Sequence, residues 1–195
     1  MAPGISCLEI KMRTVTTANE WSALAERLEK SFTDLNHAPT SANLVQASRN
    51  VVELIDKLNI GVLKLAKGDI TGNIKKVEPV DGLLEQTIPD NKKLATGALW
   101  LSRTFSFVST LMCLVVDPSY AYEEPSKLAK LAYEQTLRNY HNTVTSGIFN
   151  MGFKSLPKRK EFEEKIGLSI SEVSGHIYRF SEEVTCFARL IDQYY

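Results

Sequence analysis

Hydrophobic residues recur every three or four positions along most of this chain, which is the spacing of an amphipathic helix. Between residues 19 and 32, for example, Trp21, Leu24, Leu28 and Phe32 recur at helical spacing, with charged residues between Leu24 and Phe32. The same spacing predicts further helices over residues 41–58, 60–77, 91–116, 125–156, 158–166 and 169–194, with a short turn or helix over residues 82–87. The most apolar of these is 91–116.

Prolines lie where several of the predicted helices begin, end or are interrupted. Pro79 ends one predicted helix, Pro125 suits the first turn of another, and Pro157 interrupts the helical pattern that follows. No segment shows sustained alternation of apolar and polar positions, so we predict no strands. The sequence predicts an all-α fold of about six long helices plus short ones, packed in antiparallel layers. Residues 19–195 form one predicted domain, and weak periodicity marks residues 1–18 as an N-terminal extension.

The composition of the chain argues against some classes of function. The chain has 195 residues with 23 basic and 23 acidic side chains, and this balance argues against a nucleic-acid binder, which needs excess cations. Its odd number of widely spaced cysteines and the absence of a signal-peptide pattern predict reduced thiols in a cytoplasmic protein. The longest apolar stretch, residues 105–116, is too short to cross a bilayer, so we expect contact with membrane surfaces only.

Residues 68–77 combine helical spacing with two glycines, each costing roughly 1 kcal/mol relative to alanine in a helix. Such glycines usually allow close approach of another helix or a ligand. Asp69, Asn73 and Lys76 stand at i, i+4 and i+7 and therefore share one face. Together they offer an acceptor, an amide and a cationic donor, which suits a ligand rich in hydroxyls and amides. The alternative is a solvated face with an ion pair.

Two further residues are candidates for ligand contacts. Trp100 on a helix is typical of a core residue, but an indole face can also support a sugar ring. His141 is either a structural or a functional residue. No metal-ligand spacing, phosphate-binding loop or nucleophile elbow occurs, so we predict no metal, no cofactor and no enzymatic activity.

Three segments resemble the glycolipid transfer protein family: Asp69-Ile70-Thr71-Gly72-Asn73-Ile74-Lys75-Lys76, Trp100-Leu101-Ser102-Arg103, and the span from Tyr133 to Tyr140-His141. The landmarks cover roughly residues 54–162. The resemblance implies a two-layer helical sandwich that binds one glycosphingolipid, with the sugar headgroup at the surface and the ceramide chains in an apolar slot between the layers.

The resemblance also implies residue roles. Asp69 would accept a hydrogen bond from the ceramide N–H, and His141 would donate to the amide oxygen. Asn73 and Lys76 would bind sugar hydroxyls, and Trp100 would stack on the first sugar. Candidate slot residues, each of which could equally be ordinary core, are Phe105, Phe107, Val108, Leu111, Met112, Leu137, Val144, Ile148, Phe149, Phe180, Val184 and Phe187. We expect an empty slot to be collapsed.

One departure concerns the membrane. Family members that carry glycolipids commonly show His-Gly-Trp, whereas this chain has His141-Asn142-Thr143, without the docking tryptophan. Two alternatives could replace it at the membrane surface: the aromatic residues Tyr120, Tyr122 and Phe153, or a basic cluster of Lys154, Lys158, Arg159 and Lys160.

Another branch of the family carries ceramide phosphate and has an arginine in place of the stacking tryptophan. Because Trp100 is retained and Thr96 is uncharged, the sequence favours a sugar headgroup. The expected role is that of a carrier between membranes, cytoplasmic and peripheral to them. The alternatives are a glycolipid sensor or adaptor, a ceramide-phosphate carrier, a helical interaction module in which these residues coincide by chance, and, most remotely, an enzyme acting on glycolipid.

Overall fold

The computed structural model describes residues 7–166 and 170–195. Within those residues the only β-type pairing is an isolated bridge between Thr40 and Leu83, so the predicted all-α fold is confirmed. The helices are α1 (Cys7–His37), α2 (Ser41–Leu58), α3 (Leu63–Val77), α4 (Leu84–Thr87), α5 (Lys92–Val116), η1 (Pro118–Tyr120), α6 (Pro125–Gln135), η2 (Arg138–Tyr140), α7 (Thr143–Lys154), α8 (Arg159–Ile166) and α9 (Ile170–Asp192).

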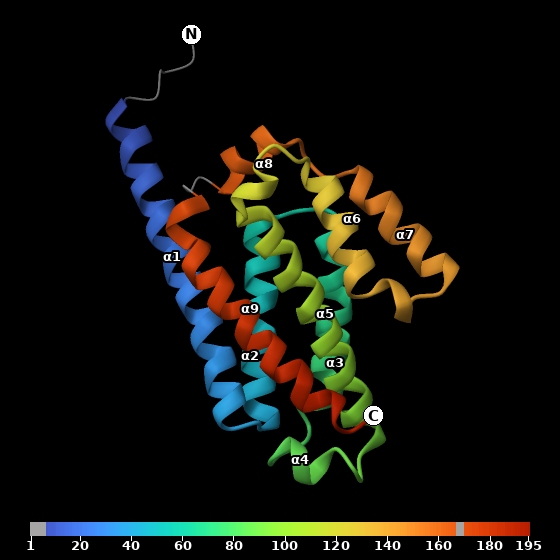
Figure 1. The fold of residues 1–195 in the computed structure, drawn as a ribbon. Coiled ribbons are helices and arrows are strands. Elements are labelled where there is room, and N and C mark those ends of the chain that lie inside the picture. The colour runs from blue at the N-terminus through green and yellow to red at the C-terminus, as the bar shows by residue number, and fades with distance from the viewer. Residues whose placement is uncertain (1–6, 167–169) are drawn as a thin grey trace.

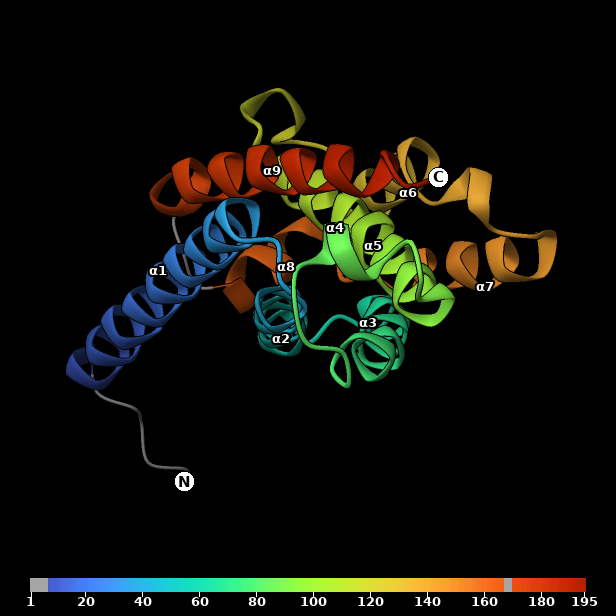
Figure 2. The ribbon, with the colours of Figure 1, turned by 90° about the horizontal axis from the view of Figure 1, so that it is seen from below.

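The long helices form two layers. Helices α1, α2 and α3 follow one another in the first layer, and α9, α5 and α6 lie side by side in the second (Figures 1 and 2). Contacts of α1 with α9 and of α3 with α5 join the two layers. Helix α7 packs on α6 at the outer edge of the second layer.

Aromatic packing fixes the centre of the sandwich. The Phe32 ring of α1 meets Phe105 of α5 and Phe180 of α9 edge to face, with both centroid distances 5.1 Å. Such pairs contribute roughly 0.5–1.5 kcal/mol beyond the area they bury. Helix α5 is the only described helix that is long and apolar enough to cross a membrane by length and composition, but 61% of that stretch is buried in this fold. It is therefore the central core helix.

The predicted start of the first helix at residue 19 is wrong. Helix α1 begins at Cys7, because residues 7–18 contain no proline or glycine to stop a helix. The division into an N-terminal extension over residues 1–18 and a domain over residues 19–195 stays a prediction. Residues 1–6, and Ser169 at the start of the last predicted helix, lie outside the described residues.

The helix predicted over residues 125–156 is also wrong, because it is divided into α6, η2 and α7. Helix α6 ends at Gln135, and the Asn142 side chain accepts a hydrogen bond from the Thr145 backbone N–H to begin α7. Asn is a preferred residue at that capping position. The break puts His141 in an extended conformation between two helices.

Candidate functional site

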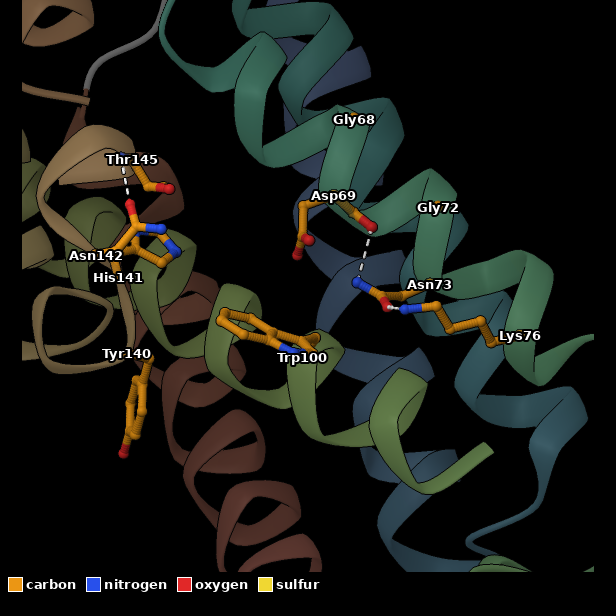
Figure 3. Close-up of a pocket in the computed structure, with 10 residues that line it drawn as sticks. All are labelled: Gly68, Asp69, Gly72, Asn73, Lys76, Trp100, Tyr140, His141, Asn142 and Thr145. Carbon is orange, nitrogen blue, oxygen red and sulfur yellow. Dashed lines mark hydrogen bonds between the residues drawn. The ribbon is translucent and has the colours of Figure 1, made fainter. Parts of the chain in front are cut away.

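All five predicted headgroup residues line one pocket of about 460 Å³. The pocket lies between α3, the N-terminal half of α5 and the segment from η2 into α7 (Figure 3). Its lining residues are Gly68, Asp69, Gly72, Asn73, Lys76, Trp100, Tyr140, His141, Asn142 and Thr145.

The polar row on α3 is held together by its own hydrogen bonds. Asn73 is only 3% exposed, and its Nδ2 donates to the Asp69 backbone oxygen at 3.0 Å. Lys76 Nζ donates to Asn73 Oδ1 at 2.7 Å. Gly97 of α5 lets that helix approach the row, because a Cβ there would lie 3.1 Å from Lys76 Cβ. The row is therefore preorganised and backed by α5.

The structure adds one residue that the sequence reasoning missed. Thr104 is buried on α5, and its Oγ1 donates to Asp69 Oδ2 at 2.7 Å. The available signal was its place one helical turn after Trp100, on the same face. This bond fixes the orientation of the Asp69 carboxylate across the two layers.

Trp100 is partly exposed at the pocket wall, so the alternative of a core residue is wrong. Its ring stacks against His141 with a centroid distance of 5.9 Å and an interplanar angle of 20°. The Arg103 guanidinium lies 3.6 Å from the Tyr140 ring centre and 5.2 Å from the Trp100 ring centre. Arg103 thus makes cation–π contacts with both rings. It lies beside the pocket and is not one of the lining residues.

His141 is oriented from behind by Tyr133, a residue that is 1% exposed. The Tyr133 hydroxyl lies 3.2 Å from His141 Nδ1 and 3.0 Å from Ser146 Oγ. Burial lowers the pKa of His141, Asp69 opposes that shift, and Arg138 adds to it. The imidazole is therefore neutral at pH 7 and can offer a hydrogen-bonding nitrogen to a ligand.

A second, mostly apolar pocket of about 220 Å³ adjoins the first and shares Asp69, His141 and Thr145 with it. Three of the predicted slot residues, Leu137, Ile148 and Phe149, line this pocket together with Leu65, Ala66 and Thr104. A polar pocket that opens into an apolar one suits an amphipathic ligand.

The other predicted slot residues line neither pocket. Val144 is 73% exposed on α7, so its assignment to the slot is wrong in this state. The remainder are buried in the core: Phe105, Phe107, Val108, Leu111, Met112, Phe180, Val184 and Phe187. A role for them in holding lipid chains stays a prediction.

The structure also revises the expected membrane contacts. Arg159 donates to the backbone oxygens of Val115, Tyr120 and Glu123, so it holds the end of α5 to the following loop. Phe153 is 3% exposed and cannot meet a membrane from that position. Tyr122 is fully exposed. Within the described residues, no group of three or more His, Cys, Asp or Glu side chains could hold a metal ion, and Cys113 and Cys186 are free thiols.

A family model and a known protein are similar to this chain. The family model described as "Glycolipid transfer protein (GLTP)" matches residues 40–168. A glycolipid transfer protein of Aureobasidium melanogenum is 31% identical over 157 residues, covering 73% of this chain and 77% of that protein.

Two solved structures share the fold. The mouse ceramide-1-phosphate transfer protein in its apo form has a TM-score of 0.72 and 16% identity, covering 88% of this chain and 95% of that one. The fungal glycolipid transfer protein HET-C2 has a TM-score of 0.63 and 19% identity, covering 78% and 81%. At these identities the likeness shows the fold alone. The headgroup of the ligand has to be inferred from the chemistry of the site.

Proposed function

Because the chain belongs to the glycolipid transfer protein family, we propose that it carries one glycosphingolipid at a time between membranes. The observation that supports this most is the convergence of Asp69, Asn73, Lys76, Trp100 and His141 on one polar pocket that continues into an apolar one. The carrier acts by binding alone, without a catalytic step, and works in the cytoplasm at membrane surfaces.

The ceramide amide would lie where the two pockets meet. Asp69 and His141 line both pockets, so they face the junction of headgroup and chains. A carboxylate oxygen would accept from the amide N–H, and the neutral imidazole would donate to the amide oxygen. A glycerolipid ester lacks the N–H, so one acceptor would stay unpaired, which costs about 1–3 kcal/mol when it is buried.

The charge of the pocket favours a sugar over a phosphate. Of the lining residues, Asp69 and Lys76 carry opposite charges, and His141 is neutral at pH 7 because burial lowers its pKa. A phosphate group carries about −1.5 to −2 charges at pH 7 and would lie beside the Asp69 carboxylate. Since Arg103 is stacked on Tyr140, Lys76 alone would face that charge. A neutral sugar that packs on Trp100 avoids this cost.

The apolar pocket supports the other half of the ligand. A lipid chain removed from water contributes about 0.8 kcal/mol for each buried CH₂ group, so even part of a ceramide chain outweighs the polar contacts in affinity. Leu137, Ile148 and Phe149 supply the apolar wall directly below the amide position. The headgroup pocket would then set selectivity, and the slot would set affinity.

Membrane contact would use α7. Val144, Ile148 and Met151 stand at i, i+4 and i+7 on one face and are 73%, 43% and 66% exposed. Ile148 and the exposed Leu65 also line the mouth of the apolar pocket, so this α7 stripe borders the entrance for lipid chains. Exposed apolar patches of this kind mark interaction sites. The stripe replaces the family's docking tryptophan with aliphatic side chains.

A vesicle transfer assay with a fluorescent monohexosylceramide tests the carrier function. We expect transfer by the wild-type protein, and its loss in Trp100→Ala and in Asp69→Val, with circular dichroism unchanged. Asp81→Val is the control, because Asp81 is an exposed acid outside both pockets. Wild-type rates in both site variants would refute the assignment, whereas binding without transfer would support a sensor.

The same assay decides between headgroups. The likeness in fold to a ceramide-1-phosphate transfer protein makes that lipid the second candidate. We expect ceramide 1-phosphate to move more slowly than the glycolipid, and faster movement would reverse the proposal.

Vesicle flotation tests the membrane contact through α7. The double variant Val144→Ser/Met151→Ser should reduce flotation with neutral vesicles. Tyr122→Ser, an exposed residue outside the α7 stripe, should leave flotation unchanged.

A further inference from the structure

Another pocket of the protein carries a charge that the proposed carrier function does not use. It has a volume of about 350 Å³ and lies between α6 and α7, which pack side by side at the outer edge of the second layer (Figure 1). Three of its lining residues are basic and none is acidic, and it shares no residue with the headgroup pocket. The lining residues are Ser126, Lys127, Lys130, Asn150, Phe153 and Lys154. We call it the α6–α7 basic pocket.

The three lysines are available to an anion. Lys154 is exposed, and its ammonium group has no hydrogen-bond or ion-pair partner within the described residues. Lys127 Nζ donates to Glu123 Oε2 at 3.0 Å. Lys130 Nζ lies 3.8 Å from Glu134 Oε1. Both pairs are exposed and join residues of one segment four positions apart, and such pairs contribute little stability, so an incoming anion can replace either carboxylate.

The rest of the lining suits a phosphorylated ring with hydroxyl groups. Ser126 lies in the first turn of α6, where the positive end of the helix dipole favours an anion. The Ser126 hydroxyl and the Asn150 amide can each donate to and accept from ligand hydroxyls. Phe153, the one apolar lining residue, is buried. A phosphomonoester carries about −1.5 to −2 charges at pH 7, which three ammonium groups balance.

The α6–α7 basic pocket also adjoins the α7 stripe. Lys154 follows Met151 by three residues, so their side chains are neighbours on the surface of α7. Met151 is 66% exposed and belongs to the stripe. A membrane that takes up the stripe therefore brings its lipid headgroups close to the basic pocket.

We propose that the α6–α7 basic pocket binds the headgroup of a membrane lipid that carries a phosphomonoester on a hydroxyl-rich ring. The lysines bind the phosphate, and Ser126 and Asn150 bind ring hydroxyls. The preference for a membrane lipid over a soluble phosphate rests on the proposed function, in which the α7 stripe meets the membrane. Because the two pockets share no residue, this lipid holds the protein on a membrane while the headgroup pocket stays free for glycolipid.

Vesicle flotation tests the pocket with three compositions. These are neutral phosphatidylcholine vesicles, the same vesicles with phosphatidylinositol 4-phosphate, and vesicles with phosphatidylserine that are matched in total negative charge. We expect the wild-type protein to bind the phosphatidylinositol 4-phosphate vesicles most tightly. In Lys130→Gln/Lys154→Gln that binding should fall about 25-fold, because each lysine close to an anionic surface contributes about fivefold.

Two single variants test the other contacts. Asn150→Ala leaves the charge unchanged and should reduce the preference for phosphatidylinositol 4-phosphate over phosphatidylserine. Glu123→Gln removes the carboxylate that pairs with Lys127 and should strengthen binding to the phosphatidylinositol 4-phosphate vesicles. Transfer of monohexosylceramide between neutral vesicles should stay at the wild-type rate in both, with unchanged circular dichroism.

Lys158→Gln/Lys160→Gln is the matched control. It removes the same charge from exposed lysines that follow α7 in the chain but do not line the basic pocket. Exposed charges at a distance from the headgroup are screened by salt, so binding to phosphatidylinositol 4-phosphate vesicles should change by less than about twofold.

Several outcomes would overturn the site. An equal loss of binding in the control and in Lys130→Gln/Lys154→Gln would show diffuse attraction to the membrane, and equal wild-type binding to both anionic vesicles would refute the phosphomonoester. Lysine-dependent binding of inorganic phosphate in calorimetry, without binding to phosphatidylinositol 4-phosphate vesicles, would refute the membrane source. A wild-type protein that binds these vesicles through the lysines but moves no glycolipid would instead refute the carrier function and leave the basic pocket supported.

Discussion

Thr104 is the point at which α5 holds the carboxylate of α3, and its substitution by valine tests whether that bond matters. The Thr104 Oγ1 donates to Asp69 Oδ2 at 2.7 Å, and valine keeps the shape of the side chain while removing the donor. A hydrogen bond to a charged group contributes about 1.5–3 kcal/mol. Because Asp69 is exposed, water can replace the lost donor, so we expect a cost near the low end. For a chain of this length, that corresponds to a fall of roughly 3–6 °C in melting temperature.

The substitution should also weaken ligand binding, in addition to its effect on stability. Without Thr104, the Asp69 side chain can rotate, and its orientation must be fixed when the lipid binds. Immobilising one such side chain costs about 0.5–1.5 kcal/mol, so the dissociation constant should rise about two- to tenfold. Thr104→Ser retains the hydroxyl and should recover most of the affinity.

Trp100 fluorescence during titration with glycolipid vesicles measures this constant, because Trp100 lines the pocket. Thr71→Val is the control: the Thr71 hydroxyl donates only to carbonyls of its own helix, those of Lys67 and Gly68. If Thr104→Val lowered the melting temperature while its dissociation constant stayed at the wild-type value, Thr104 would be a structural residue and the preorganisation of Asp69 would be refuted.

Three further predictions concern the neutral imidazole of His141, Arg159 at the C-terminal end of α5, and the free thiols. Burial lowers the pKa of His141 below its ordinary value of 6.5, so the unfolded chain binds the proton first and the free energy of unfolding falls as the pH drops below about 6.5. Urea unfolding at about pH 7.5 and 5.5 should show a smaller fall for His141→Asn than for wild type, and equal falls would contradict this. Arg159→Met removes three bonds to backbone carbonyls and should cost about 2 kcal/mol, or roughly 4–8 °C in a thermal melt, whereas Lys158→Met should stay within about 0.5 kcal/mol of wild type. Burial raises the pKa of the Cys113 thiol, and Cys186 is exposed, so peptide-resolved labelling should find Cys186 modified before Cys113; faster labelling of Cys113 would show that α5 and α9 separate readily.

Helical periodicity in the sequence predicted much of the fold correctly. The α2 boundaries agree with prediction because the Thr40 side chain accepts from the Asn43 N–H and so caps the helix where the apolar stripe begins. The shared face of Asp69 and Asn73 follows from the helix repeat alone. The division of residues 125–156 was missed because its cause is local capping at Asn142, which a continuous apolar pattern conceals.

Contacts between helices were beyond the reach of the sequence pattern. The stack of Trp100 on His141 and the bond from Thr104 to Asp69 join residues 35 or more positions apart, and no spacing along the chain encodes them. Burial was equally hard to assign on α7. Phe149 and Val144 both look apolar in sequence, yet the first faces the core and the second faces solvent, because the division of the helix sets the rotation of α7 on α6.

The position of α7 bears on how a small slot could admit a large ligand. The apolar pocket of about 220 Å³ is smaller than the range of about 300–1,000 Å³ for drug-sized ligands, so the two chains of the proposed ligand would require it to widen. The C-terminal half of α7 is held closely, since Gly152 packs directly on Val62 at the start of α3. The N-terminal half carries Ile148 at the pocket wall and Val144 in solvent. A membrane that takes up the α7 stripe would therefore pull on the end of the helix that closes the slot, which couples docking to opening.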